Sequence, residues 1–185
     1  MLRLARPLVA LLLVVTAASV SGCASTVSMA AAPSANETGC AEMMVRLPDT
    51  LSGQSRRWTD AQSTAAWGDP ATVLFTCGVT PPGPTTLRCD TVSGVDWIVD
   101  ESQAPTYRVT TFGRTPAIEL FLDTQSNDRV QGVSSREVLD ALSPIVSQLP
   151  VDGQCVDRED ATLVPDPETT PAPADTSTPA PTPAS

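Results

Sequence analysis

Carboxylates are the side chains of this sequence that could carry out acid–base chemistry. The 185 residues include 21 acids and 11 arginines, but no histidine and no lysine. Without histidine, a His-based triad, metal site or proton shuttle is excluded. Asp96, Asp100 and Glu101 could pair as the acid and base of an envelope glycan hydrolase, or bind calcium. Nothing fixes their spacing, and in so acidic a chain we interpret them as a solvated face.

The cysteines predict one lipid attachment and two disulfides. Cys23 follows an export leader, and four cysteines in the exported part of a chain can pair in three ways. Cys77 ends an apolar run and Cys89 lies in the next, with a turn-forming stretch, residues 80–84, between them. Opposed residues of a hairpin come close enough to be bridged, so we expect a disulfide between Cys77 and Cys89. Cys40 and Cys155 are then left to form the second disulfide. A nucleophilic thiol is the alternative, but no histidine exists to activate it.

Four further residues are candidates for ligand binding. Trp67 and Asp69 lie in the stretch Trp67-Gly68-Asp69-Pro70, where Trp67 could stack on a sugar and Asp69 could accept hydrogen bonds. The alternative is a turn with Trp67 in the core. Arg114 could hold a carboxylate or phosphate, or simply pair with one of the excess acids. Tyr107, the only tyrosine, is a candidate for the same pocket, unless it is a half-buried strand residue.

The N-terminus has the layout of a bacterial lipoprotein leader. Residues 1–22 combine two arginines, a short apolar run and small residues, and Val20-Ser21-Gly22-Cys23 resembles a lipobox. We therefore expect cleavage before Cys23 and a lipid anchor on its thiol, on the extracytoplasmic face of the membrane. Loss of Arg3 and Arg6 takes the formal net charge from −10 to −12. Such a chain, without a basic cluster, is not expected to bind nucleic acid.

Composition divides the mature chain into three parts. Residues 23–39 are small and polar and predict a flexible tether, which reaches at most about 50 Å when extended. Residues 40–156 are sufficient for one globular domain with a single core. Residues 157–185 are acidic, then rich in Pro, Thr and Ala, and predict a disordered tail.

Hydrophobic periodicity predicts an α+β domain. Apolar residues recur at helical spacing from Cys40 to Leu47, and again after a capping box at Ser134–Glu137, in a helix that Pro144 should kink or split. Five strands are expected between these helices, at residues 71–79, 87–92, 95–99, 106–112 and 117–122. Residues 52–59 are a weak strand candidate, and 61–67 read as a helical turn or loop. The order of these elements along the chain, helix, strands, then helix, predicts an antiparallel sheet of about five strands, with an N-terminal and a C-terminal helix on one face.

Several motifs of this chain form a familiar combination: the lipobox, Trp67–Pro70 before the strand Val73–Val79, Val95–Ile98 and Phe112–Pro116. Together they resemble an actinobacterial family of exported lipoproteins classed as a domain of unknown function (DUF3515-like). It covers about Cys40 to Cys155, and implies a cell-envelope location and no assigned activity. Phe112 stands where the family pattern leads us to expect tyrosine.

The sequence favours a non-catalytic envelope module without metal or cofactor. Its expected partners are the membrane, through the lipid, and an envelope protein or wall glycan. A hydrolase using paired carboxylates is the second hypothesis. A structural spacer, with the Pro/Thr tail threading into wall polymer, is the third.

Overall fold

The computed structural model describes residues 25–128 and 130–156. The predicted leader, 1–22, the predicted lipidation site Cys23 and the predicted disordered tail, 157–185, lie outside the described residues. The chain separates into a folded unit that ends at Cys155 and a second unit from Val156 onward, of which only Val156 is described. In the described part, no helix is long and apolar enough to cross a membrane.

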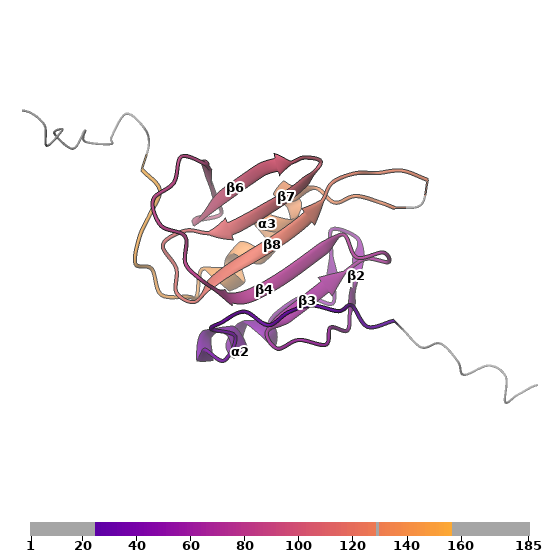
Figure 1. Ribbon diagram of the computed structural model, residues 1–185, viewed down its shortest axis with the longest axis horizontal. Coiled ribbons are helices and arrows are strands. Elements are labelled where there is room, and N and C mark those ends of the chain that lie inside the picture. Colours follow the sequence, from indigo (N-terminus) through magenta and orange to yellow (C-terminus); the bar gives the residue numbers. More distant parts are fainter. Residues whose placement is uncertain (1–24, 129, 157–185) are drawn as a thin grey trace, which may run out of the picture. The chain divides into compact units, whose positions relative to one another are not determined.

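One antiparallel sheet of eight strands forms the frame of the domain (Figure 1). The strands are β1 (Thr50–Leu51), β2 (Gln54–Arg57), β3 (Thr64–Trp67), β4 (Val73–Val79), β5 (Arg88–Val92), β6 (Val95–Gln103), β7 (Thr106–Thr111) and β8 (Ala117–Asp123). Their order in the sheet is β1-β2-β3-β4-β8-β7-β6-β5. The five expected strands are present, and the two-residue turn predicted at Ser93-Gly94 joins β5 to β6 with both residues at positive φ.

The expected number of strands was wrong because residues 50–67 add three. The weak candidate 52–59 contains β2, and β1 lies before it as the first strand of a hairpin that turns at Ser52-Gly53. Residues 61–67, expected as a turn or loop, contain β3. All four residues of β3 are buried, so this strand lacks the alternation of polar and apolar residues by which a half-exposed strand is recognised.

Two helices flank the strands in the described sequence, α2 (Thr38–Met44) and α3 (Ser135–Val146). The hydroxyl of Ser134 caps α3 by accepting from the amide of Glu137 at 3.4 Å, as the capping box predicts. The Glu137 carboxylate accepts instead from the Ser52 hydroxyl at 2.9 Å, so only half of the box forms. Pro144 does not split α3, because the helix ends two residues later and little of it depends on the lost amide.

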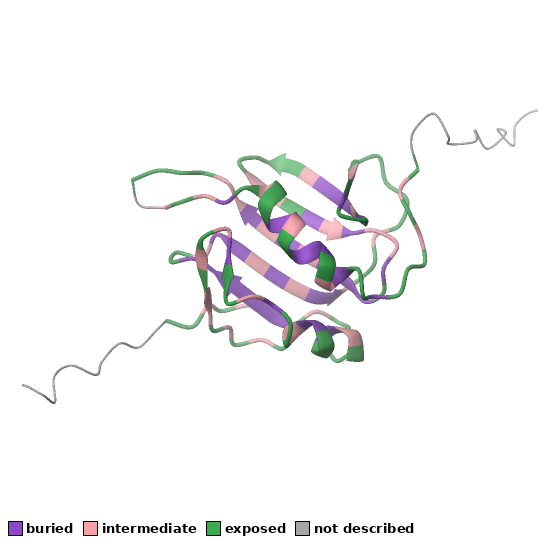
Figure 2. Cartoon of the chain, turned by 180° about the vertical axis from the view of Figure 1, so that it is seen from behind, coloured by how far each residue is buried: buried purple, intermediate pink, exposed green. Residues whose placement is uncertain are grey.

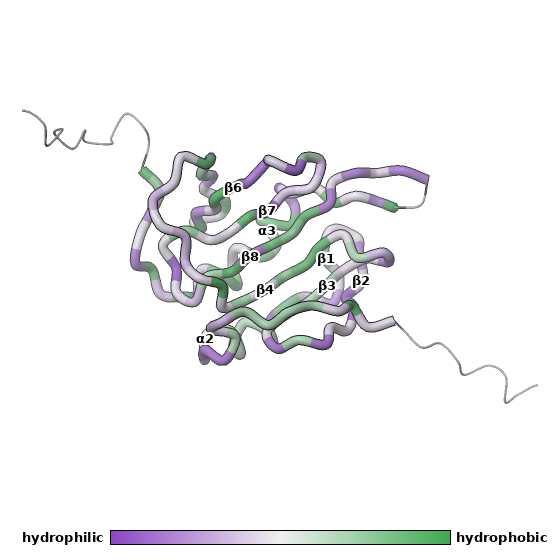
Figure 3. Tube along the Cα trace, in the orientation of Figure 1, coloured by the Kyte–Doolittle hydropathy of each residue, from purple (hydrophilic) through white to green (hydrophobic). Residues whose placement is uncertain are grey.

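Both helices cover the same face of the sheet. A single core joins the buried residues of α2 and α3 to those of the strands. The pairs Phe75↔Leu120 and Leu120↔Val109 show that the buried side chains of β4, β8 and β7 share this face. Figure 2 shows α3 across the sheet and the alternation of buried residues beneath it. Apolar residues run along β4 and β8 in Figure 3, at the centre of the sheet.

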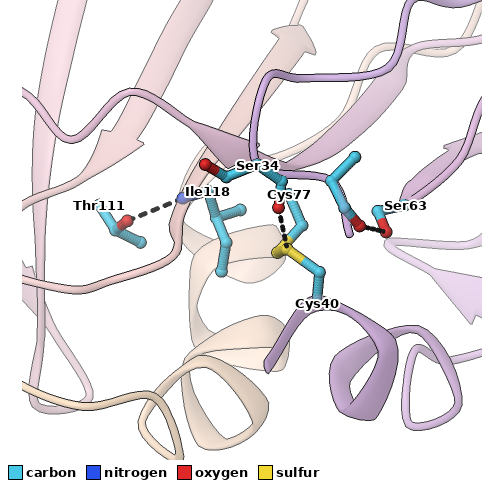
Figure 4. The surroundings of a disulfide bond; sticks show 7 residues. Ser34, Cys40, Ser63, Cys77, Thr111 and Ile118 are labelled. Carbon is cyan, nitrogen blue, oxygen red and sulfur yellow. Dashed lines mark hydrogen bonds between the residues drawn. A yellow bond between two sulfur atoms is a disulfide. The ribbon is translucent and has the colours of Figure 1, made fainter. Parts of the chain in front are cut away.

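The segment expected to be a tether is bound to the domain from residue 25 onward. The amide of Val27 donates to the carbonyl of Trp58 at 2.8 Å, and that of Ser34 to the carbonyl of Gly78 at 2.9 Å. The hydroxyl of Ser63 donates to the carbonyl of Ala35 (Figure 4). Both residues are buried. The segment passes over β3 in Figure 1. Its small residues resemble a linker in composition, but they also permit this close approach to the sheet.

Gly78 shows how close that approach is. Its φ is +92°, and a Cβ built at this position would overlap the backbone of Ser34. Only glycine fits both the backbone conformation and the space. The N-terminal segment, defined as residues 25–37, is therefore part of the folded domain.

The four cysteines form two disulfides, as expected, but the expected pairing was wrong. Cys40 of α2 is bonded to Cys77 of β4 with Cα atoms 5.6 Å apart, and Cys89 of β5 to Cys155 with Cα atoms 6.3 Å apart. β4 and β5 follow one another along the chain, but β8, β7 and β6 separate them in the sheet. Four strand spacings are about 19 Å, far beyond what a disulfide spans.

Peptide mapping should find this pairing. Trypsin cleaves after arginine, and cleavage after Arg46, Arg57, Arg88, Arg108, Arg136 and Arg158 places each of the four cysteines on a separate peptide. We expect mass spectrometry of the unreduced digest to show the Cys40 peptide linked to the Cys77 peptide, and Cys89 to Cys155. A Cys77–Cys89 link would contradict the observed sheet order.

Candidate functional site

A groove of about 530 Å³ lies where β2 turns into β3. It is bounded by the end of α2, the chain before β1, the end of β2 and the start of β3. The residues that line it are Met44, Asp49, Arg56, Arg57, Trp58, Thr59, Ala61, Ser63 and Thr64. The lining is mixed, with an aromatic ring, two guanidiniums, one carboxylate and several hydroxyls. We call this feature the Trp58 groove.

Trp58 is displayed on a fixed backbone. Its side chain is 79% exposed, while its carbonyl accepts from the amide of Val27. The turn that follows is held by the hydroxyl of Thr64, which donates to the carbonyl of Ala61 at 2.6 Å and lies 2.9 Å from the hydroxyl of Thr59. A large exposed ring on a rigid turn loses little freedom when it binds a partner.

Arg56 rests on the buried ring of Trp67. Its guanidinium carbon is 5.9 Å from the ring centroid, and Nη1 donates to the carbonyl of Leu47 at 3.3 Å. Trp67 itself is fully buried, and its Nε1–H donates to the carbonyl of Pro48 at 3.0 Å. The cation–π contact positions Arg56 in the wall of the groove.

Arg57 is occupied by contacts within the protein. Its Nη1 lies 2.8 Å from Oδ1 of Asp69 and donates to the carbonyl of Gly68 at 2.9 Å. Its Nη2 donates to the carbonyl and hydroxyl of Ser25. The ion pair contributes little stability because Asp69 is 83% exposed, but the set of bonds ties the N-terminal segment to the end of β2.

Two of the predicted binding residues therefore lie behind the groove. The prediction that Trp67 forms a binding lip was wrong, because a fully buried ring cannot stack on a ligand; the core alternative holds. Asp69 supports Arg57 from outside the lining. The motif Trp67–Pro70 thus lies next to the groove, where Trp67 and Asp69 contact Arg56 and Arg57 of its lining.

Arg114 is structural. Its side chain is buried and donates to three backbone carbonyls, those of Gly94, Ser147 and Leu149, at 3.1, 3.3 and 2.9 Å. Both predicted partners, a ligand anion and a surface carboxylate, were therefore wrong. The guanidinium joins the β5–β6 turn to the end of α3, below a second hollow of about 410 Å³.

Tyr107 lies elsewhere in the sheet. It is half-buried on β7 and lines a hollow of about 10 Å³ with Arg108 and Phe121, which is room for one water molecule at most. The expected common pocket with Arg114 does not form, because the two residues line separate hollows. The half-buried strand interpretation holds.

The three carboxylates considered for hydrolysis have partners within the fold. Asp96 accepts from the hydroxyl of Thr91 at 2.6 Å and from the amide of Cys155 at 2.7 Å. Asp100 accepts from the amide of Ser102, and hydrogen bonds from Ser102 lower the pKa of this carboxyl. Glu101 pairs with Arg88 at 2.9 Å. Each acid thus has a structural role, and no observation favours them as a catalytic pair.

Trp58 is the site residue that sequence reasoning missed. It follows Arg56-Arg57 directly, the only pair of adjacent basic residues in the chain. Because arginine is mostly found at the surface, two adjacent arginines indicate an exposed stretch in which the following tryptophan also lies. The sequence pattern predicts only a weak strand for this segment, residues 52–59, and assigns Trp58 no role.

Asp60 anchors the N-terminal segment next to the groove. Its carboxylate accepts from the amide of Met29 at 2.8 Å and from the hydroxyl of Ser28 at 2.9 Å. These bonds favour the charged form and lower the pKa of Asp60 below its ordinary value of 3.8, with the Met29 amide as the largest cause.

One family model matches the chain: that described as "Protein of unknown function (DUF3515)" matches residues 3–150. No curated protein and no solved structure matches the chain significantly.

The Asp60 contact should respond to acid. A lowered native pKa means that the contact stabilises the N-terminal segment above the ordinary pKa and is lost as pH falls through the native one. We expect the Met29 amide resonance in NMR spectra to titrate with a midpoint below 3.8, and to lose this titration in Asp60→Ala. A midpoint at or above 3.8 would contradict the bond; Glu42→Ala, an exposed substitution on α2, is the control.

Replacement of Arg114 should destabilise the domain without a ligand being involved. Arg114→Ala leaves three carbonyls without their charged donor, and we expect a loss of about 3 kcal/mol in the free energy of unfolding by urea. Arg136→Ala, which removes an exposed pair with Asp140 on α3, should cost less than about 0.5 kcal/mol. Equal effects of the two substitutions would contradict the structural role.

Proposed function

The chain belongs to the family of proteins of unknown function DUF3515, and we propose that it is a lipid-anchored, non-catalytic binding module of the cell envelope. The anchor is proposed from the sequence: an export leader that ends in Val20-Ser21-Gly22-Cys23. Two or more acyl chains on Cys23 would hold the domain stably at the membrane, where one chain gives only marginal binding. The family match begins at residue 3 and so includes this leader.

The observation that carries the binding role is the exposed ring of Trp58 at the Trp58 groove. Aromatic residues in interfaces supply a large contact area and are frequent binding hot spots. The groove beside it offers about 530 Å³, with polar and apolar groups that could fix the orientation of a ligand. A structural spacer needs no such feature, so the groove favours binding over the spacer hypothesis.

The composition of the groove favours binding over hydrolysis. Hydrolysis of glycosides generally requires two carboxylates about 5 to 9.5 Å apart. Among the described residues that line the groove, Asp49 is the one acid. The groove therefore has an aromatic platform and hydrogen-bonding groups, but not the paired acid and base. An envelope protein, a wall glycan or the lipid surface are the classes of partner that a cell-envelope location makes available.

Loss of the lipidated cysteine should release the protein. We expect Cys23→Ala to shift the protein from the membrane fraction to the medium, measured by fractionation of intact cells and immunoblotting. Cys89→Ala/Cys155→Ala, which removes a disulfide but not the anchor, should leave any folded product in the membrane fraction. Retention of the Cys23→Ala protein at the membrane would contradict the proposed anchor.

A photoreactive residue in place of Trp58 should capture the partner. We expect benzoylphenylalanine at position 58 to form adducts in intact cells that the same residue at position 87 does not form. Leu87 is a matched control because it is 46% exposed and precedes β5, at the other edge of the sheet. Since the Trp58 side chain is exposed, its replacement should change stability by no more than about 0.5 kcal/mol. Identical adducts at both positions would contradict a binding site at the groove.

A further inference from the structure

The described chain begins directly beside Trp58. Nη2 of Arg57 donates to the carbonyl of Ser25 at 2.7 Å and to its hydroxyl at 2.6 Å. The amide of Val27 donates to the carbonyl of Trp58 at 2.8 Å, and Asp60 holds the next two residues. The chain therefore enters the folded domain at the rim of the Trp58 groove.

Very little chain separates this point from Cys23. Ala24 alone lies between Cys23 and Ser25. Two residues span at most about 7 Å, so a lipid on Cys23 starts within that distance of Ser25. A free tether as far as residue 39 would have let the domain stand off the membrane. With residues 25–37 bound to the domain, an acylated Cys23 brings the rim of the groove to the bilayer surface.

The rim carries a side chain suited to that surface. Tryptophan is enriched at membrane–water interfaces, because its ring is apolar and its N–H still finds a hydrogen-bond acceptor. Val45, which follows the groove residue Met44, is also exposed, at 83%. Positive and negative charges balance in this region. Arg57 is paired with Asp69, and the groove lining contains both Arg56 and Asp49. The contact thus depends on the ring more than on net charge.

We infer that the partner of the Trp58 groove is the phospholipid surface, with the ring of Trp58 in the headgroup layer. This inference rests on the proposed lipid anchor and names the partner of the same site.

The position at which the chain leaves the fold is consistent with this inference. Cys155, where the described fold ends, is bonded to Cys89 of β5, at the opposite edge of the sheet from β2 and about 30 Å away by strand spacing. The chain then enters at the membrane side and leaves on the side that faces away.

Tryptophan fluorescence can test this contact in the complete lipidated protein. The other two tryptophans, Trp67 and Trp97, are fully buried, so external quenchers report on Trp58. The protein is reconstituted in phosphatidylcholine vesicles, with and without phosphatidylglycerol, and compared with soluble Cys23→Ala protein. We expect quenching by aqueous acrylamide to fall severalfold on the vesicles, the emission to shift to the blue, and lipids brominated near the headgroup to quench it. Both vesicle compositions should give this result.

The outcomes separate this inference from the proposed anchor. Trp58→Phe should float with the vesicles and lose all three fluorescence changes, which assigns them to this ring. A protein that does not float overturns the anchor and the inference together. A protein that floats while Trp58 stays as accessible to acrylamide as in solution overturns the inference alone. In that case, protein or glycan adducts at position 58 in cells would identify a different partner for the groove.

Discussion

The docking of the N-terminal segment on the sheet is the constraint on which the rest of the account depends. The disulfide between Cys40 and Cys77 fixes α2 against β4, and residues 25–37 then run from α2 back to the end of β2. This segment holds the backbone of Trp58 through the amide of Val27, and its Ala35 carbonyl accepts from Ser63 just before β3, so it supports the site without lining it. It also determines where an N-terminal anchor must meet the domain. Without this docking, the groove would lose a support and the domain would hang on a free tether.

The sheet order gives the domain two distinct ends. The chain enters beside β2 and, after α3, is tied by Cys89–Cys155 to β5 at the opposite edge. Buried Arg114 joins the turn of the β5–β6 hairpin to the chain after α3, so this second edge is tied to the helix layer. With the anchor proposed at Cys23, the edge at β2 would lie at the membrane and the edge at β5 would lie away from it. The proposed orientation follows from this arrangement.

The sequence predicted those elements whose burial alternates along the chain, and missed those shaped by contacts between distant segments. Strands β4 to β8 and the Ser93-Gly94 turn follow from local pattern, as does the cap of α3. The strand β3 does not, since Ala65 and Ala66 point to opposite faces of the sheet and both are buried. The disulfides were mispaired because residues 80–84 read as a hairpin turn, although the chain there crosses the sheet to β5. Trp67, Asp69 and Arg114 were chosen by residue type, whereas their roles depend on burial, which sequence alone did not show.

Amide hydrogen exchange along the N-terminal segment tests the central claim most directly. The amides of Val27 and Ser34 are bonded to the carbonyls of Trp58 and Gly78, so they should exchange far more slowly than those of a free peptide. The exposed stretch around Gly83, between β4 and β5, is an internal reference for fast exchange. Protection across residues 27–35 is the result that the account predicts. Exchange there as fast as around Gly83 would show a free tether, and would contradict both the docking and the proposed short distance from the anchor to the groove.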